Sequence, residues 1–285
     1  MQSYWFGDLN GIGCHLCSKD PSALAERLTG RIHTKHPFEM PACQIAIDCG
    51  FVQTRNEYIE VLRSLCIHLA KKQIQSYYQQ SDIELLQMVR TLDELDEVIN
   101  LLTGRAVEWY QTRHPQFSRK YQKLPAKRMF AVMEKGSDGI FREFMGTIGH
   151  LTSMRSALMR DVSERADEVL PNTSALVGGL VAARLASGAG GLQELSRLPG
   201  SAIQVIGSRT ALFSHLRSGT PPPKHGIIFQ HRRVHNAPKE VRGRVARVLA
   251  AKLGIAARID YYRRIPVPEF IASAQVAIDR AGLIK

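Results

Sequence analysis

This chain of 285 residues lacks the features that mark a membrane or exported protein. No stretch approaches the roughly 20 uncharged apolar residues that a membrane-spanning helix needs. Its first residues, MQSYWFGDLNG, contain no basic region followed by an apolar run, so we expect no signal peptide. We therefore expect a protein of a reducing, intracellular compartment, whose five cysteines are thiols or ligands and form no disulfide framework.

Motifs for catalysis and for cofactor binding are also missing. The chain has no nucleophile elbow, no glycine-rich phosphate loop and no pair of carboxylates in a pocket-like setting. Cys14 and Cys17 form a CxxC motif without a second one, which favours ordinary thiols over zinc or a thioredoxin-like site. Basic residues, which would repel a divalent cation, surround a group of four histidines: His215, His225, His231 and His235. We expect no catalytic residue, no cofactor and no metal.

Acidic residues are scarce in the last third of the chain. From Ser201 to Lys285 there are 15 Lys and Arg but only four Asp and Glu, whereas the first 200 residues hold 23 basic and 22 acidic ones. Eleven of the 15 are Arg, whose planar guanidinium suits phosphate oxygens and base edges. This concentration favours a nucleic-acid-binding surface over a merely solvated basic face.

The patterning predicts a mainly helical protein with a small N-terminal α/β domain, in three parts. In residues 1–80 we expect a strand at SYWFG, a turn from Asp8 to Cys17, a helix beginning at Pro21, a second strand at CQIAIDCG and a helix over 56–79. Residues 81–170 should form a helical hairpin that is partly coiled coil. Residues 171–285 should form a basic, all-helical domain.

Two long helices are expected to form the hairpin. Ser81 is the predicted N-cap of the first, which continues to HPQF with a heptad seam made of Leu85, Met88, Leu92, Leu95, Ile99, Leu102, Ala106 and Trp109. The second runs over about 138–170, after linker segments at KLPAKR and EKGSDG, and places Arg155 and Arg165 on its seam. Because a buried unpaired guanidinium is costly, we expect weak self-association, with Glu94 or Glu97 pairing inside one hairpin.

The third part begins with TSALVGGLVAARLASGAGG, whose small residues favour close helix packing over a phosphate loop. Short helices are expected over 192–198 and 208–217. A proline-stiffened loop, SGTPPPKHG, follows, and then a helix over 239–254.

Two adjacent segments carry a family resemblance. GSRTALFSHLRSGTPPPKHGIIFQH and RGRVARVLAAKLGIAARIDYY together resemble the signature of the Nop domain, in its archaeal form. This domain belongs to the scaffold protein of box C/D ribonucleoproteins. The resemblance extends upstream through LPNTSALVGGLVAARLASGAGGLQELSRLPGSAIQVIG to the first long helix and to WFGDL, while residues 118–155 lack a clear counterpart.

The resemblance implies a non-catalytic scaffold. Such a protein docks on a kink-turn guide RNA already held by a small ribosomal-protein-like kink-turn protein. Its N-terminal domain holds fibrillarin, the methyltransferase that carries out guided ribose 2′-O-methylation of rRNA. A shortened coiled coil and the ending DRAGLIK imply at most a weak homodimer and an archaeal cytoplasmic protein. The alternative is a free-standing RNA- or DNA-binding regulator that uses the same basic module.

The implied surface for RNA and the kink-turn protein can be placed residue by residue. A helix N-terminus at Ser208 would present N–H groups to a phosphate. For Phe213, core packing is an equally open interpretation, whereas the stiff proline run favours contact for Lys224 and His225. The full set comprises Ser208, Arg209, Phe213, Arg217, Pro223, Lys224, His225, Gly226, Arg244 and Lys252.

Overall fold

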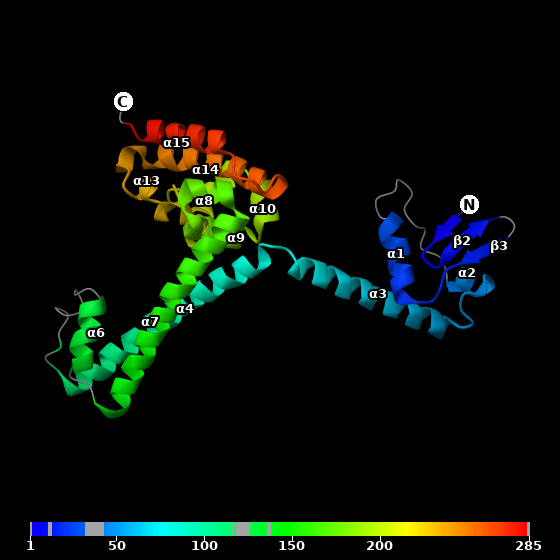
Figure 1. Ribbon diagram of the computed structural model, residues 1–285, viewed down its shortest axis with the longest axis horizontal. Coiled ribbons are helices and arrows are strands. Elements are labelled where there is room, and N and C mark those ends of the chain that lie inside the picture. The colour runs from blue at the N-terminus through cyan, green and yellow to red at the C-terminus, as the bar shows by residue number, and fades with distance from the viewer. Residues whose placement is uncertain are drawn as a thin grey trace. The chain divides into compact units, whose positions relative to one another are not determined.

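The computed structural model describes residues 2–10, 13–31, 43–115, 117, 126–135 and 138–283 (Figure 1). It consists of two compact units, Met1–Gln80 and Ser81–Lys285. The first contains a three-stranded sheet and the second is helical, which confirms the predicted fold class. Within the described ranges, no helix combines the length and the apolar character needed to cross a bilayer.

The first unit is built on an antiparallel sheet of three short strands, β1 (Gln2–Tyr4), β2 (Gly7–Asn10) and β3 (Gly13–Leu16). Asp8 pairs with Ser3 on one side and with His15 on the other. The turn expected from Asp8 to Cys17 is therefore wrong, since most of that segment forms two strands. At four residues each, β2 and β3 are too short to show a two-residue apolar period.

Helices α1 (Pro21–Arg31), α2 (Cys43–Asp48) and α3 (Arg55–Tyr78) complete this unit. The first and third confirm the predicted helices, but α2 replaces the strand expected at CQIAIDCG. Its alternating apolar residues imitate a strand, whereas only Ala46 is buried and Gly50, with φ +75°, follows the helix end. Aromatic rings of Trp5, Phe6 and Phe51 pack together beside Tyr58 and form the core.

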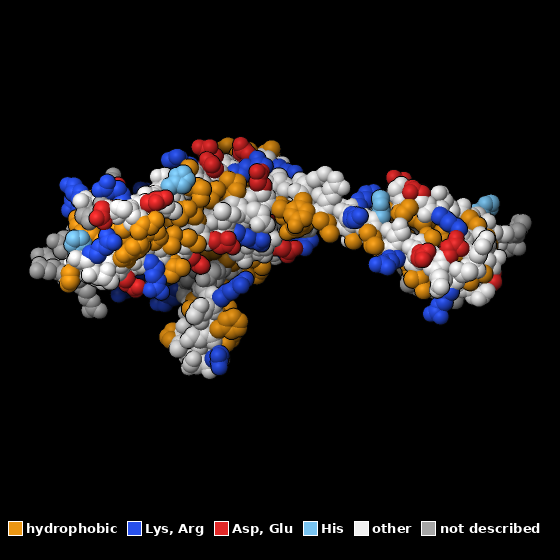
Figure 2. Space-filling view, turned by 90° about the horizontal axis from the view of Figure 1, so that it is seen from below, with side chains coloured by type: hydrophobic (Ala, Val, Ile, Leu, Met, Phe, Trp, Pro, Cys, Tyr) orange, Lys and Arg blue, Asp and Glu red, His pale blue; other side chains and the backbone are white. Residues whose placement is uncertain are grey.

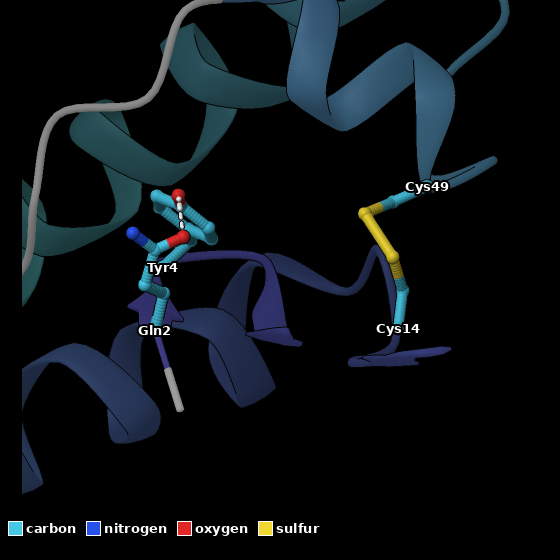
Figure 3. Close-up of a disulfide and its surroundings, with 4 residues drawn as sticks. All are labelled: Gln2, Tyr4, Cys14 and Cys49. Carbon is cyan, nitrogen blue, oxygen red and sulfur yellow. Dashed lines mark hydrogen bonds between the residues drawn. A yellow bond between two sulfur atoms is a disulfide. The ribbon is translucent and has the colours of Figure 1, made fainter. Parts of the chain in front are cut away.

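A disulfide joins Cys14 of β3 to Cys49, just after α2 (Figure 3). The expectation that all five cysteines are thiols or ligands is therefore wrong for this pair. Their Cα atoms lie 5.7 Å apart, within the usual range for a disulfide, and 35 positions separate them in the sequence. The pairing could not be read from spacing, because it depends on α2 being a helix. Cys17, Cys43 and Cys66 are unpaired.

The second unit begins with the helical hairpin, α4 (Ile83–Arg113) and α7 (Gly139–Val169), as predicted. A further helix, α6 (Ala126–Lys135), lies between them in the chain, where a linker was expected. Residues 123–125 and 136–137 of that linker fall outside the described residues. Ser81 does not cap α4: the buried carboxylate of Asp82 precedes the helix and accepts the N–H of Leu192 at 2.7 Å.

Both seam arginines of α7 are paired within the hairpin. Arg155 donates to both carboxylate oxygens of Asp96, and its Nη2 lies 3.3 Å from Oδ2. Arg165 lies 3.6 Å from Glu84 and 2.6 Å from Glu168. Pairing inside one hairpin was expected, but the partners Glu94 and Glu97 were wrong. Asp96 and Glu84 are acids of α4, whereas Glu168 lies on α7 itself, three residues after Arg165.

Nine helical segments follow the hairpin within residues 171–283, and all of them except α12 contribute side chains to a core shared with the hairpin. They are α8 (Pro171–Val177), α9 (Gly179–Ala189), α10 (Leu192–Arg197), α11 (Gly200–Val205), α12 (Arg209–Ser218), the 3₁₀ turn η1 (Ile227–Gln230), α13 (Arg232–His235), α14 (Lys239–Tyr262) and α15 (Pro268–Gly282).

Small residues let these helices approach closely, as expected. A Cβ at Gly179 would lie inside van der Waals contact with Ser163 of α7, including its Oγ at 2.6 Å. At Gly200, a Cβ would lie 3.1 Å from the Cα of Ala251 on α14. Side chains at these glycines would separate helices that bury a common core.

A buried carboxylate connects α8, α14 and the segment before α15. Asp260 is fully buried, and its Oδ1 accepts the backbone N–H and the Nδ2 of Asn172 at 2.9 and 2.7 Å. Its Oδ2 accepts the N–H and the hydroxyl of Thr173 at 2.9 and 2.7 Å. Asn172 in turn donates to the carbonyl of Ile265 and accepts from the N–H of Val267.

Asp260→Asn should lower the free energy of unfolding by about 3 kcal/mol, because the amide turns two accepted hydrogen bonds into a clash of donors. Urea unfolding followed by circular dichroism measures the change. Asp279→Asn is the matched control, since the Asp279 side chain is 59% exposed and forms a surface ion pair with Arg233, and it should cost under about 1 kcal/mol. Equal losses for the two variants would contradict a central role for Asp260.

The purified chain should be mostly monomeric at micromolar concentration, because its seam arginines are paired internally. Hydrophobic side chains remain visible among charged ones in the space-filling view (Figure 2). One exposed hydrophobic residue of α4 is Leu101, which is 62% exposed. Leu101→Glu should therefore reduce any residual dimer further. Sedimentation velocity measures both effects, and a tight dimer at micromolar concentration would show the weak-association prediction to be wrong.

Candidate nucleic-acid and protein interface

Helix α12 carries three of the predicted site residues, Arg209, Phe213 and Arg217, and a fourth, Ser208, directly precedes it. None of the side chains of this helix is buried. It is bracketed by two glycines with left-handed backbone, Gly207 (φ +83°) and Gly219 (φ +65°). The Ser208 hydroxyl donates to the carbonyl of Val205 at 2.6 Å and makes no cap bond to α12. Packing against the core therefore does not account for the position of this helix.

The exposed face of α12 mixes apolar and basic side chains. Phe213 is 63% exposed and Leu216 is 71% exposed, so core packing of Phe213 is excluded. Arg209, Phe213 and Arg217 line a shallow depression together with Thr210, Ser214 and Ser218. Leu216 was not predicted as a site residue, although its spacing from Phe213 puts both on neighbouring turns.

The loop after α12 is fastened to α11 at its far end. Gln204 donates through Nε2 to the carbonyl of Lys224 at 2.7 Å, and its own carbonyl accepts the N–H of Gly226 at 2.9 Å. The N–H of Ile227 bonds to the carbonyl of Ile206 at 2.8 Å. The sequence analysis did not single out Gln204. It is the one polar side chain in the apolar run AIQVIG, and this pattern could have marked it.

A basic groove lies between this loop and the first turns of α14. We call it the loop groove, and it is lined by Gln204, Pro221, Pro222, Pro223, Lys224, Lys239, Glu240, Gly243, Arg244 and Arg247. The structure thus brings Pro223, Lys224 and Arg244 together, although they lie apart in the sequence. Lys252 lines no part of it, because it sits eight residues beyond Arg244, about 12 Å along the helix.

Arg244 also holds the end of the chain. Its Nε donates to the carbonyl of Ala281 at 2.8 Å and its Nη2 to that of Leu283. Both of these partners are backbone carbonyls, which carry no formal charge. The same side chain therefore fastens the end of α15 and contributes positive potential to the groove.

His225 stacks on Phe229, with ring centroids 4.4 Å apart and planes 13° from parallel. The Arg242 guanidinium lies 5.4 Å from the centroid of the Phe229 ring. Burial lowers the pKa of His225, and the charges of Arg242 and Lys224 lower it further. His225 thus supports the base of the loop, and it is Lys224 that is exposed in the groove.

Acidification should destabilise the chain below about pH 6.5. Burial and nearby arginines also lower the pKa of His231, so the folded chain binds fewer protons than the unfolded chain near pH 6. The stabilising contribution is complete above the ordinary histidine pKa of 6.5 and is lost as the pH falls below it. His225→Gln with His231→Gln should flatten the change in melting temperature between about pH 7.5 and 5.5. An unchanged profile would contradict this.

Gly226→Ala should destabilise the chain by about 2 kcal/mol or more, since the new Cβ would overlap the Ile206 carbonyl. Gly243→Ala is the matched control. Gly243 lies inside α14, and its Cβ would meet only the Cδ of Lys224 at 4.0 Å, so alanine should stabilise by about 0.5–1 kcal/mol. The melting temperature should therefore fall for Gly226→Ala and rise for Gly243→Ala, which thermal unfolding measures.

Comparison with known proteins identifies relatives over most of the chain. The Nop family model, described as a snoRNA binding domain, fibrillarin, matches residues 129–276. A NOP5 family protein of Methanocaldococcus jannaschii is 34% identical over an alignment of 254 residues, which covers 76% of this chain and 61% of that protein. Nucleolar protein 56 of Caenorhabditis elegans is 28% identical over 66% of this chain and 48% of its own length.

A chain in a crystal structure of a fibrillarin/Nop5p complex is similar throughout, with 26% identity and a TM-score of 0.53. The similarity covers 97% of this chain and 98% of that one. The curated relatives are longer, and this chain spans about half to three fifths of their length. The family model covers both the hairpin helix α7 and the loop groove. Because it matches just over half of the sequence, this chain belongs to the Nop-domain family.

Proposed function

We propose that this protein is a non-catalytic scaffold of a box C/D complex for RNA-guided 2′-O-methylation of rRNA. In this proposal the second unit docks on a kink-turn guide RNA that already carries its small kink-turn-binding protein. The first unit holds the methyltransferase fibrillarin. The chain itself positions these components and transfers no methyl group.

The observation that carries the proposal is the exposure of α12. A ten-residue helix with no buried side chain gains no stability from the core, while it exposes Phe213 and Leu216 to water. Apolar anchors flanked by Arg209 and Arg217 suit a composite partner, in which protein covers the apolar residues and RNA phosphates meet the cations. A ring such as Phe213 could also stack on a base, but Leu216 has no ring, so a surface for RNA alone would leave Leu216 uncovered.

The loop groove supports the RNA half of this proposal. Lys224, Lys239, Arg244 and Arg247 line it, and Glu240 is its one acidic residue. The prolines fix the loop backbone before binding, so less conformational entropy is lost when the groove is filled. Cations held in this way release counterions from an RNA backbone and so make binding strongly dependent on salt.

The first unit supports the protein half. It has its own core and its own sheet, and it forms a compact unit distinct from Ser81–Lys285. The crystal structure that resembles this chain is described as a fibrillarin/Nop5p complex. A module with a separate core can bind an enzyme without disturbing the helices that bind RNA.

Reconstitution tests the proposal. The purified chain, fibrillarin, the kink-turn protein and a box C/D guide RNA should form one complex that methylates a matching target, with residues 1–110 sufficient to hold fibrillarin. Labelled methyl transfer should be absent with the chain alone. Transfer by the chain alone, or equal binding to naked duplex RNA lacking the kink-turn protein, would overturn the proposal.

Site variants sharpen this test. Phe213→Ser and Lys224→Gln should each weaken assembly by about 1–3 kcal/mol without lowering the melting temperature, because both side chains are exposed. Ile140→Ser controls for the loss of an exposed apolar side chain, since Ile140 is 64% exposed on α7. Lys135→Gln controls for the loss of one charge. If the controls weaken assembly equally, the site assignment is wrong.

A further inference from the structure

Helix α14 extends well beyond the loop groove and keeps one face exposed along its whole length. The exposed positions recur at three- and four-residue steps, from Arg244 and Arg247 through Ala251 and Ile255 to Arg258 and Tyr262. The opposite face packs into the core. At 1.5 Å per residue, Tyr262 lies about 22 Å from Arg247 along the helix axis. The far end of this face is outside every site considered above.

That far end carries unbalanced positive charge. From Lys239 to Arg264 the sequence has eight Lys and Arg and two acids. One acid is Glu240 at the loop groove, and the other is Asp260, which is buried and occupied by internal donors. Throughout the described ranges, no acidic side chain forms an ion pair with Arg258, Arg263 or Arg264.

The backbone that presents these arginines is firmly held. The N–H groups of Arg263 and Arg264 both reach the carbonyl of Ile259, at 2.8 and 3.2 Å. Arg264 has φ +57°, the one non-glycine with positive φ among the residues the structure describes. The next carbonyl, that of Ile265, accepts from the buried Asn172. Arg258 is fixed differently, by its Nε donating to the carbonyl of Ser196 at 3.1 Å.

An exposed aromatic ring lies among these cations. Tyr262 is 75% exposed, so packing accounts for little of its surface. Its ring meets that of Tyr261 edge to face, at 4.9 Å between centroids. Arginines beside an exposed aromatic ring form the combination that binds single-stranded nucleic acid, in which cations hold phosphates and the ring stacks on a base. A protein partner with an acidic surface would gain from the arginines but would not require the exposed ring.

We propose that Arg258, Tyr262, Arg263 and Arg264, here called the distal patch, bind an unpaired stretch of RNA. This stretch continues along α14 from the RNA held at the loop groove. The arginines contact its phosphates, and Tyr262 stacks on one base. The inference rests on the proposed function in one respect, which is that RNA enters at the loop groove.

The test compares two kink-turn RNAs, each bound by the kink-turn protein, using the full chain. One RNA is blunt, and the other carries single-stranded extensions of roughly ten nucleotides at both ends, enough to span the ~22 Å along α14. The variant is Arg258→Gln with Arg263→Gln and Arg264→Asn, where asparagine tolerates the left-handed backbone. The control, Arg90→Gln with Lys135→Gln and Arg160→Gln, removes the same charge from exposed positions on α4, α6 and α7.

With the extended RNA, the distal variant should lose at least tenfold in affinity, and its slope of log K against log salt should fall by about 2. The control variant should match the native chain. With the blunt RNA all three should bind alike. Tyr262→Ala should weaken binding of the extended RNA roughly fivefold or more, while Tyr262→Phe, which keeps the ring, should not. Annealing complementary strands to the extensions should abolish the effect of Tyr262→Ala.

Each other result overturns the inference. Native affinity of the distal variant for the extended RNA would show that the patch binds no RNA. An equal loss with the blunt RNA would place a protein partner there instead. An undiminished effect of Tyr262→Ala on annealed extensions would exclude base stacking. If the native chain bound neither RNA, the proposed function itself would fail, and this outcome is distinct from the others.

Discussion

The four hydrogen bonds accepted by Asp260 are the interaction on which the second unit depends. A carboxylate can be fully buried only when donors occupy its oxygens, and Asn172 and Thr173 supply these from the first turn of α8. The Asn172 side chain also bonds to the backbone on either side of Pro266, at the carbonyl of Ile265 and the N–H of Val267. One side chain therefore fixes the backbone between the end of α14 and the beginning of α15. The hairpin helix α7 passes directly into α8 at this point, so the same contacts orient the hairpin.

The hairpin and the helices after it form a single cooperative structure. Leu85, Val89 and Leu92 of α4 pack in the same core as residues of α9 and α14. Arg184 of α9 adds an ion pair to Asp93 at 3.0 Å and a hydrogen bond to Gln230 beside the loop region. A force applied to the hairpin would therefore be transmitted through packed side chains and ion pairs to the loop groove. Cutting the chain at residue 170 would expose the apolar side of this core.

Local patterns in the sequence predicted most of the helices but not the contacts between distant residues. The apolar period of α4 and the stop of α7 at Pro171 are local, and both helices were predicted correctly. At the end of the expected seam, however, Trp109 is exposed and Tyr110 is buried instead. The error at CQIAIDCG arose because a six-residue helix with one buried side chain has almost no helical pattern. The disulfide then followed from that helix and was missed with it. Similarly, the proline loop was found from sequence, whereas its groove with α14 depends on Gln204 and on the close approach at Gly226.

Helix α12 contributes no side chain to the core, so the binding role proposed for it is separate from the packing of the fold. Substitutions at Phe213 or Leu216 change what the helix can recognise while leaving the buried residues untouched. Under the proposed function, substitutions at these positions alter partner affinity and leave the packed core unchanged. Two glycines with left-handed backbone, Gly207 and Gly219, flank this ten-residue helix, so the positions that tolerate substitution form one continuous segment, here called the α12 cassette. Such a cassette can acquire new specificity by single substitutions, and a library randomised within it would sample binding in an otherwise constant scaffold.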